Sequence, residues 1–112
     1  METRDLTELV RFSPEGPAHN SVFESERLWS QLVCLEQGHQ LGPITDEASD
    51  AVFTVIAGRV VIQVDRRRKR LSQWGSALVP AGTEVTVTNA GGDPAVIFVV
   101  AAPPPTPRTA SG

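Results

Sequence analysis

The chain has 112 residues, a hydrophobic fraction of 40% and a formal net charge of −3. A chain of this length folds as one domain and buries roughly two-thirds of the surface that its unfolded form exposes. Its negative charge gives no general attraction to nucleic-acid phosphates. The longest apolar run, Ala95 to Ala102, is far shorter than the ~20 residues of a membrane-spanning helix. We therefore expect neither a nucleic-acid nor a membrane partner.

The expected compartment is the cytoplasm. Cys34 is the only cysteine, so the chain forms no internal disulfide and suits a reducing environment. The N-terminal residues Met-Glu-Thr-Arg-Asp-Leu lack the basic start and apolar run of a secretory signal.

The N-terminal segment, residues 1–20, is mixed in character and is expected to be an arm with one short strand near 9–12. After it, short β-branched runs alternate with glycine and proline, and no long stretch keeps a helical period. Strands are predicted at residues 28–36, 52–56, 60–65, 77–79, 84–88 and 95–101. Short strands separated by turn signals indicate an all-β sandwich or barrel, which we expect over residues 21–101.

Two local details complete this prediction. Residues 52–56 and 60–65 are separated by Ala57-Gly58 and are expected to form an antiparallel hairpin. Residues 102–112 are rich in proline, which lacks the N–H donor that a sheet ladder needs. This tail is expected to be disordered.

A first spacing pattern joins five positions: Gly38, five residues, Ile44, one residue, Asp46, four residues, Ala51, six residues, Gly58. It resembles the first motif of the cupin family, in which the two glycines enclose His-x-His and a glutamate. The full interval between the glycines is preserved, whereas the histidines and the glutamate are absent.

A second pattern runs Pro80, one residue, Gly82, two residues, Val85, three residues, Asn89. It is similar to the second cupin motif, with valine in place of a histidine. The glycine that opens that motif falls at Trp74, so this turn is expected to be altered. The resemblance covers about residues 28–101 and implies a single-domain jelly-roll barrel (a double-stranded β-helix) of two antiparallel sheets. It also implies a homodimer.

Most cupins hold a metal on three histidines and a glutamate, and the resemblance places those ligands at Ile44, Asp46, Ala51 and Val85. Metal ions need nitrogen, oxygen or sulfur donors that converge on one point, and only Asp46 can supply one. We therefore predict no metal and no cofactor. A relocated site that uses Asp46 with His39 and Asp50 is the alternative.

Strand alternation supports the same frame without reference to the family. Val85 and Val87 share one face of their predicted strand, and Ala51 and Phe53 share one face of another. Because these faces are apolar, they are expected to point inward. The predicted ligand pocket comprises Ile44, Asp46, Ala51, Phe53 and Val85.

Three functions follow from this interior. The first, which we favour, is a metal-free domain that binds a small organic ligand in the apolar barrel. The second is an enzyme, with isomerase or lyase chemistry on Asp46 as acid or base, or with oxygenase or isomerase chemistry on the relocated metal. The third is a barrel with a solid core that serves as an oligomerisation or interaction scaffold.

Other conspicuous residues are given ordinary roles. The five consecutive cations Arg66–Arg70 suggest an anion site, but without interleaved aromatic residues they are better explained as a solvated hairpin tip. His19 and His39 lie in sequence typical of loops, outside any nucleophile motif. Cys34 is expected to be a small buried hydrophobic residue.

Overall fold

The structure, a computed structural model, describes residues 1–105 and is almost entirely β. Its elements are η1 (Leu6–Leu9), β1 (Ala18–Glu24), β2 (Trp29–Leu35), β3 (Gln40–Thr45), β4 (Asp50–Ala57), β5 (Arg59–Val64), β6 (Arg67–Ser72), β7 (Ser76–Val79), β8 (Glu84–Thr88) and β9 (Ala95–Ala102). Within this part of the chain, no helix is long and apolar enough to cross a membrane.

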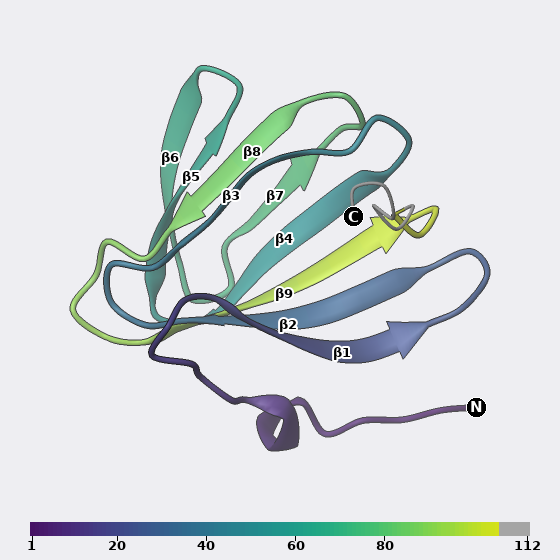
Figure 1. The fold of residues 1–112 in the computed structure, drawn as a ribbon, viewed down its shortest axis with the longest axis horizontal. Coiled ribbons are helices and arrows are strands. Elements are labelled where there is room, and N and C mark those ends of the chain that lie inside the picture. Colours follow the sequence, from purple (N-terminus) through teal and green to yellow (C-terminus); the bar gives the residue numbers. More distant parts are fainter. Residues whose placement is uncertain (106–112) are drawn as a thin grey trace.

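The strands form two antiparallel sheets that face each other (Figure 1). One has five strands in the order β1-β2-β9-β4-β7, and the other has four in the order β3-β8-β5-β6. The strands of both sheets converge at one end and fan out at the other, where β9 ends (Figure 1). The all-β prediction of two antiparallel sheets is confirmed.

The core lies between the two inner faces, and its composition follows from side-chain alternation along each strand. Val85 and Val87 of β8 both point inward and are buried, as do Phe53 and Val55 of β4. Alternate positions on β8 remain partly or fully exposed. The predicted inward faces of these strands are therefore confirmed.

The predicted hairpin of residues 52–56 and 60–65 is wrong. Strand β4 pairs with β7 and β9, whereas β5 pairs with β6 and β8, so the two segments belong to different sheets. Gly58 makes this change of sheet in a left-handed conformation, with φ of 82°. A Cβ atom there would lie 2.6 Å from the carbonyl oxygen of Pro94. A short glycine turn looks the same in sequence whether the chain stays in its sheet or leaves it.

Three strands, β1, β3 and β6, were not predicted from the sequence. Strand β3 contains Gly42-Pro43, and its pairing with β8 shifts register between Leu41 and Ile44. These residues interrupt the local strand signal. Strand β6 contains most of the cationic run that was predicted to be a hairpin tip; the turn lies at Asp65-Arg66, and Arg67–Arg70 pair with β5. Charge at a sheet edge hides a strand from propensity-based prediction.

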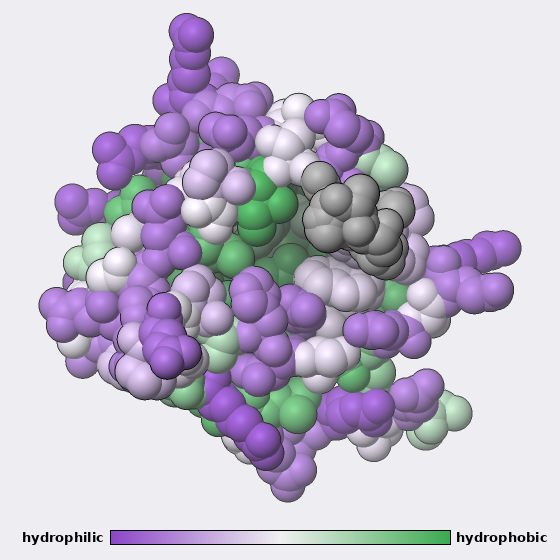
Figure 2. Space-filling model, viewed as in Figure 1, coloured by the Kyte–Doolittle hydropathy of each residue, from purple (hydrophilic) through white to green (hydrophobic). Residues whose placement is uncertain are grey.

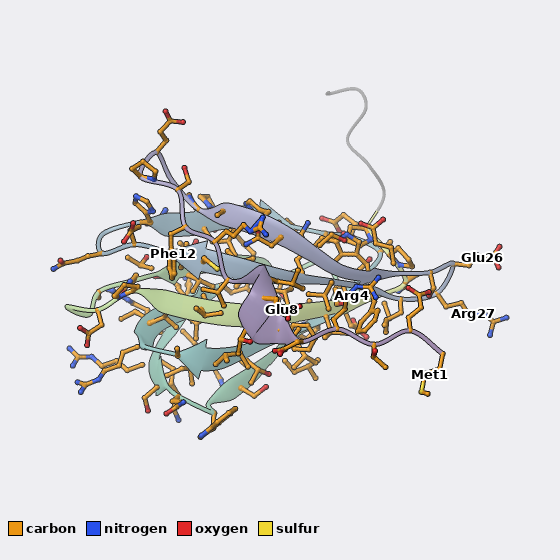
Figure 3. The ribbon with its side chains drawn as sticks, turned by 90° about the horizontal axis from the view of Figure 1, so that it is seen from below. Met1, Arg4, Glu8, Phe12, Glu26 and Arg27 are labelled. Atoms are coloured by element: carbon orange, nitrogen blue, oxygen red, sulfur yellow. The ribbon has the colours of Figure 1, made fainter. Side chains whose placement is uncertain are left out.

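The N-terminal arm covers the outer face of the five-stranded sheet, as Figure 3 shows from Met1 to Phe12. The 3-10 helix η1 lies partly where a short strand was expected, and the Asp5 side chain caps it by accepting a bond from the Thr7 amide. Strand β1 begins within the arm. Cys34 is fully buried, as predicted, in the apolar cluster between the arm and the outer face of the five-stranded sheet. This burial raises the pKa of its thiol.

The converging end of the barrel, called the closed end below, is held by a fully buried Asn89. Its Nδ2 donates to the carbonyl oxygens of Leu35 and Asp93, both at 2.9 Å, and its Oδ1 accepts from the Gly91 amide at 3.0 Å. These bonds join the end of β2 to the loop between β8 and β9. The motif asparagine is therefore a structural residue in this chain.

Trp74 occupies the position of the second motif's opening glycine and keeps a glycine-like conformation, with φ of 74°. Its amide donates to the carbonyl oxygen of Val55 at 2.7 Å, and its side chain is 71% exposed. This turn is therefore formed by a residue that disfavours its backbone conformation.

Candidate ligand-binding site

A cavity of about 320 Å³ opens at the splayed end of the barrel, called the mouth below. Its lining residues are His19, Trp29, Gln31, Val33, Leu41, Ile44, Asp46, Ser49, Ala51, Phe53, Val79, Pro80, Thr83, Val85, Val99, Ala101 and Pro105. Most are apolar, and Figure 2 shows hydrophobic side chains inside a hollow on this face. The volume lies at the lower end of the range for small-molecule sites.

The structure places all five predicted pocket residues on this cavity. Ile44 of β3 lies opposite Val85 of β8 in the sheet, and Phe53 and Ala51 of β4 lie on the other sheet. Phe53 and Val85 are 5% exposed, whereas Ile44 is 40% exposed at the rim. The positions of the family's metal ligands therefore surround a real space, although three of the four carry hydrocarbon side chains.

Asp46, the one ionisable residue among these positions, holds the turn between β3 and β4. Its Oδ1 accepts hydrogen bonds from the amides of Ala48 and Ser49, at 2.9 and 3.0 Å. Its carbonyl oxygen accepts from the Gly82 amide at 2.8 Å, which ties this turn to the turn before β8. These bonds give Asp46 a structural role that is independent of any chemistry in the cavity.

The donors of the predicted alternative metal site are not brought together. His39 precedes β3 and Asp46 follows it, so the two residues lie at opposite ends of that strand. The Nδ1 of His39 accepts from the Glu36 amide at 3.3 Å, and a carboxylate oxygen of Asp50 accepts from the Ala81 amide at 2.8 Å. Across residues 1–105, no group of three or more His, Cys, Asp or Glu side chains could hold a metal ion. The side chains present do not fit the family's metal.

Sequence reasoning missed the polar part of the rim. His19 was assigned to a loop, but it lies in β1 and lines the cavity, with its Nδ1 3.1 Å from Oε1 of Gln31 on β2. A carbonyl oxygen only accepts, so Nδ1 donates in this pair. No sequence signal could have found it, because the pairing of β1 with β2 was not predicted.

The rim is completed by the end of the chain that the structure describes. The Ser49 hydroxyl donates to the carbonyl oxygen of Pro103 at 2.5 Å, and Pro105 lines the cavity. Ala102 still belongs to β9 and pairs with Asp50. The predicted disordered tail therefore begins with ordered residues, and residues 106–112 lie outside the described part.

Two facing antiparallel sheets around an internal cavity define a double-stranded β-helix barrel with an open cavity at its mouth. The family model described as "Cupin domain" matches residues 31–101, and the chain belongs to this family. This result agrees with the resemblance carried by the two motifs.

Solved structures support the same assignment. The crystal structure of TT1209 from Thermus thermophilus is 36% identical, with a TM-score of 0.89 over 96% of this chain and 100% of that chain. The fold is shared by an uncharacterised double-stranded β-helix protein from Klebsiella pneumoniae, which is 20% identical with a TM-score of 0.86 over 92% of this chain and 90% of that chain. It is also shared by KdgF from Halomonas sp., which is 18% identical with a TM-score of 0.76 over 84% of each chain. No protein with a curated functional description matches the sequence significantly.

Proposed function

We propose that the protein binds a small organic molecule in the barrel cavity without using a metal. One observation carries this proposal: the four positions of the family's metal ligands line an open cavity, and three of them are Ile44, Ala51 and Val85. Substituting hydrocarbon for metal ligands removes the donors while leaving the space itself open. Such a site favours an apolar ligand body.

The distribution of polar groups sets the orientation of the ligand. The deep wall is formed by aliphatic and aromatic side chains, including Val33, Phe53 and Val99. At the rim, His19 is exposed and its partner Gln31 is half-buried. A ligand with an apolar body and one hydrogen-bonding end satisfies both parts, since a polar group placed deeper would lose its partners.

The cavity also bears on the other candidate functions. A scaffold with a solid core has no need of an open space beside Phe53, so the cavity favours binding over that role. Acid–base chemistry on Asp46 would compete with the hydrogen bonds that hold its turn. The homodimer implied by the family remains a prediction, which analytical ultracentrifugation tests.

The test compares a cavity-filling variant with a matched outer-face variant. Ala51→Phe places a ring in the cavity, whereas Val61→Phe adds the same kind of bulk to a strand position that does not line it. With indole, cyclohexanol and 1-octanol as probes, ¹H–¹⁵N NMR should show shift changes at the lining residues in the wild type and in Val61→Phe, and none in Ala51→Phe. Saturable binding of no probe, or equal binding to Ala51→Phe, would overturn the cavity as the site.

A separate measurement tests the metal-free part. Elemental analysis of untagged protein should find no stoichiometric transition metal, because the cavity offers one carboxylate among four ligand positions. One equivalent of metal, removed by a chelator with loss of thermal stability, would contradict this expectation.

A further inference from the structure

Strand β6 is an exposed edge that carries an unbroken run of cations. It is the last strand of its sheet and, among the described residues 1–105, pairs only with β5. Arg67–Arg70 are all exposed, and Figure 2 shows hydrophilic side chains over this hairpin. Within residues 1–105 the salt bridge is Arg4–Glu2, so none of the β6 cations has a carboxylate partner there. Within the described residues, the β6 edge therefore carries both cations without ion-pair partners and backbone N–H and C=O groups without a neighbouring strand.

The register distributes these cations over both faces of the strand. Arg68 and Arg70 lie opposite Gln63 and Val61, on the outer face of the sheet. Arg67 and Lys69 lie opposite Val64 and Ile62, on the other face. An extended chain laid along β6 would therefore meet an arginine at every second residue on the outer face.

A surface hollow extends the cationic face beyond β6. Arg70 and Arg59 both line it, together with Ser72 and Gly91, and its volume is about 480 Å³. No acidic side chain lines it within the described part of the chain. Arginine binds carboxylates through two parallel hydrogen bonds, so the hollow suits an acidic side chain at one end of the edge.

Two simpler explanations account for only part of this arrangement. Charge on an edge strand prevents sheets from joining, but that role does not require a third arginine, Arg59, beside the same hollow. A nucleic-acid surface would combine cations with aromatic residues for base stacking, and neither β6 nor the hollow, as far as residues 1–105 define it, contains an aromatic residue.

We propose that β6 docks an acidic, extended segment of a partner protein, which adds a strand to the four-stranded sheet. Its backbone would pair with the free edge of β6, as in other cases of strand addition. Its acidic side chains, two residues apart, would lie against Arg68 and Arg70, and a terminal one would enter the hollow beside Arg59. This interaction is independent of the cavity, which lies at the mouth between the two sheets.

The test uses the full chain and a capped hexapeptide of alternating glutamate and valine. NMR should show shift changes at β6 and slower exchange of β6 amides when the peptide is added. A control peptide with every backbone nitrogen methylated keeps the charge but has no backbone N–H to donate to β6, and it should bind about tenfold more weakly. Arg68→Ser with Arg70→Ser should weaken the first peptide about tenfold, whereas Arg27→Ser, an exposed cation between β1 and β2, should leave its affinity unchanged.

Three results would overturn the proposal. The first is equal binding of the two peptides, which would indicate charge attraction without strand addition. The second is tighter binding of a thymidine oligonucleotide than of the peptide, lost in the double variant, which would indicate a nucleic-acid surface. The third is no saturable binding of the first peptide by the wild type. Serine on an exposed strand keeps the fold, so thermal melting should differ little between the variants.

Discussion

Both ends of the barrel contain positions of the two cupin motifs, but the closed end has the motif residues themselves, whereas the ligand positions at the mouth have other residues. At the closed end, Gly38, Gly58 and Asn89 occupy their motif positions and hold the backbone together. At the mouth, the ligand positions carry other residues, and the chain still folds around a cavity. The difference separates motif residues that build the barrel from those that serve a ligand. Changes at the closed end should therefore cost more stability than changes at the mouth.

The largest loss is expected for Asn89→Ala. It removes three hydrogen bonds, leaves the Leu35 carbonyl oxygen unpaired in a buried site, and takes away the side-chain partner of the partly buried Asp93 carbonyl oxygen and Gly91 amide. Each buried polar group left unpaired costs about 1–3 kcal/mol, so the free energy of unfolding should fall by about 4 kcal/mol in urea titrations. The matched control is Gln40→Ala, which removes an exposed amide and should cost less than about 0.5 kcal/mol. A similar loss in both would contradict a special role for the closed end.

Gly58→Ala should be the next most damaging change. A residue with a Cβ is strained at its φ of 82°, and the Cβ would collide with the carbonyl oxygen of Pro94. Strain and displacement together should cost about 3 kcal/mol. Gly38→Ala is the control, since Gly38 has φ of 84° but no atom of the described part of the chain lies within 4 Å of the added Cβ. It should cost about 1 kcal/mol, and calorimetric melting of both variants measures the difference.

A pair on one strand compares the core with the mouth directly. Val85 and Val87 share the inner face of β8, but only Val85 lines the cavity. Val87→Thr buries a hydroxyl in close-packed surroundings and should cost about 2 kcal/mol. Val85→Thr places it beside the cavity and should cost less than about 1 kcal/mol, as measured by urea unfolding. If Val85→Thr cost more stability than Val87→Thr, the cavity would not lower the free-energy cost of burying a hydroxyl group.

The smallest effects are expected at Asp46. Asp46→Ala removes the acceptor of two turn amides and should cost about 1 kcal/mol, like the loss of a helix cap. Asp46→Asn keeps a side-chain oxygen in place and should change the free energy of unfolding by less than about 0.5 kcal/mol. Probe binding should be unaltered in Asp46→Asn; its loss there would restore a direct role for the carboxylate in the site.

The predictions from sequence succeeded where the signal was local. Alternation identified the inward faces of β4 and β8, because side-chain direction along a strand does not depend on which strand lies beside it. The motif spacing placed Ile44, Ala51 and Val85, because interval lengths follow from the barrel itself. Together they identified five of the 17 residues that line the cavity.

The errors arose where the outcome depends on distant parts of the chain. Gly58 gives the same turn signal whether the chain reverses within a sheet or crosses to the other one, and the choice is made by the pairing of β4 with β9. His19 reaches the rim only through the pairing of β1 with β2. The volume of the cavity depends on how all the lining side chains fit together, and no local pattern encodes it.

The positions of the two tryptophans give the molecule a built-in optical signal. The chain has no tyrosine, and of its two indoles one, Trp29, borders the cavity while the other, Trp74, projects into solvent. In a Trp74→Phe variant all indole emission would come from the cavity rim. Displacing water from that rim should shift the emission to the blue, so an unlabelled sample could report its own occupancy in a fluorimeter.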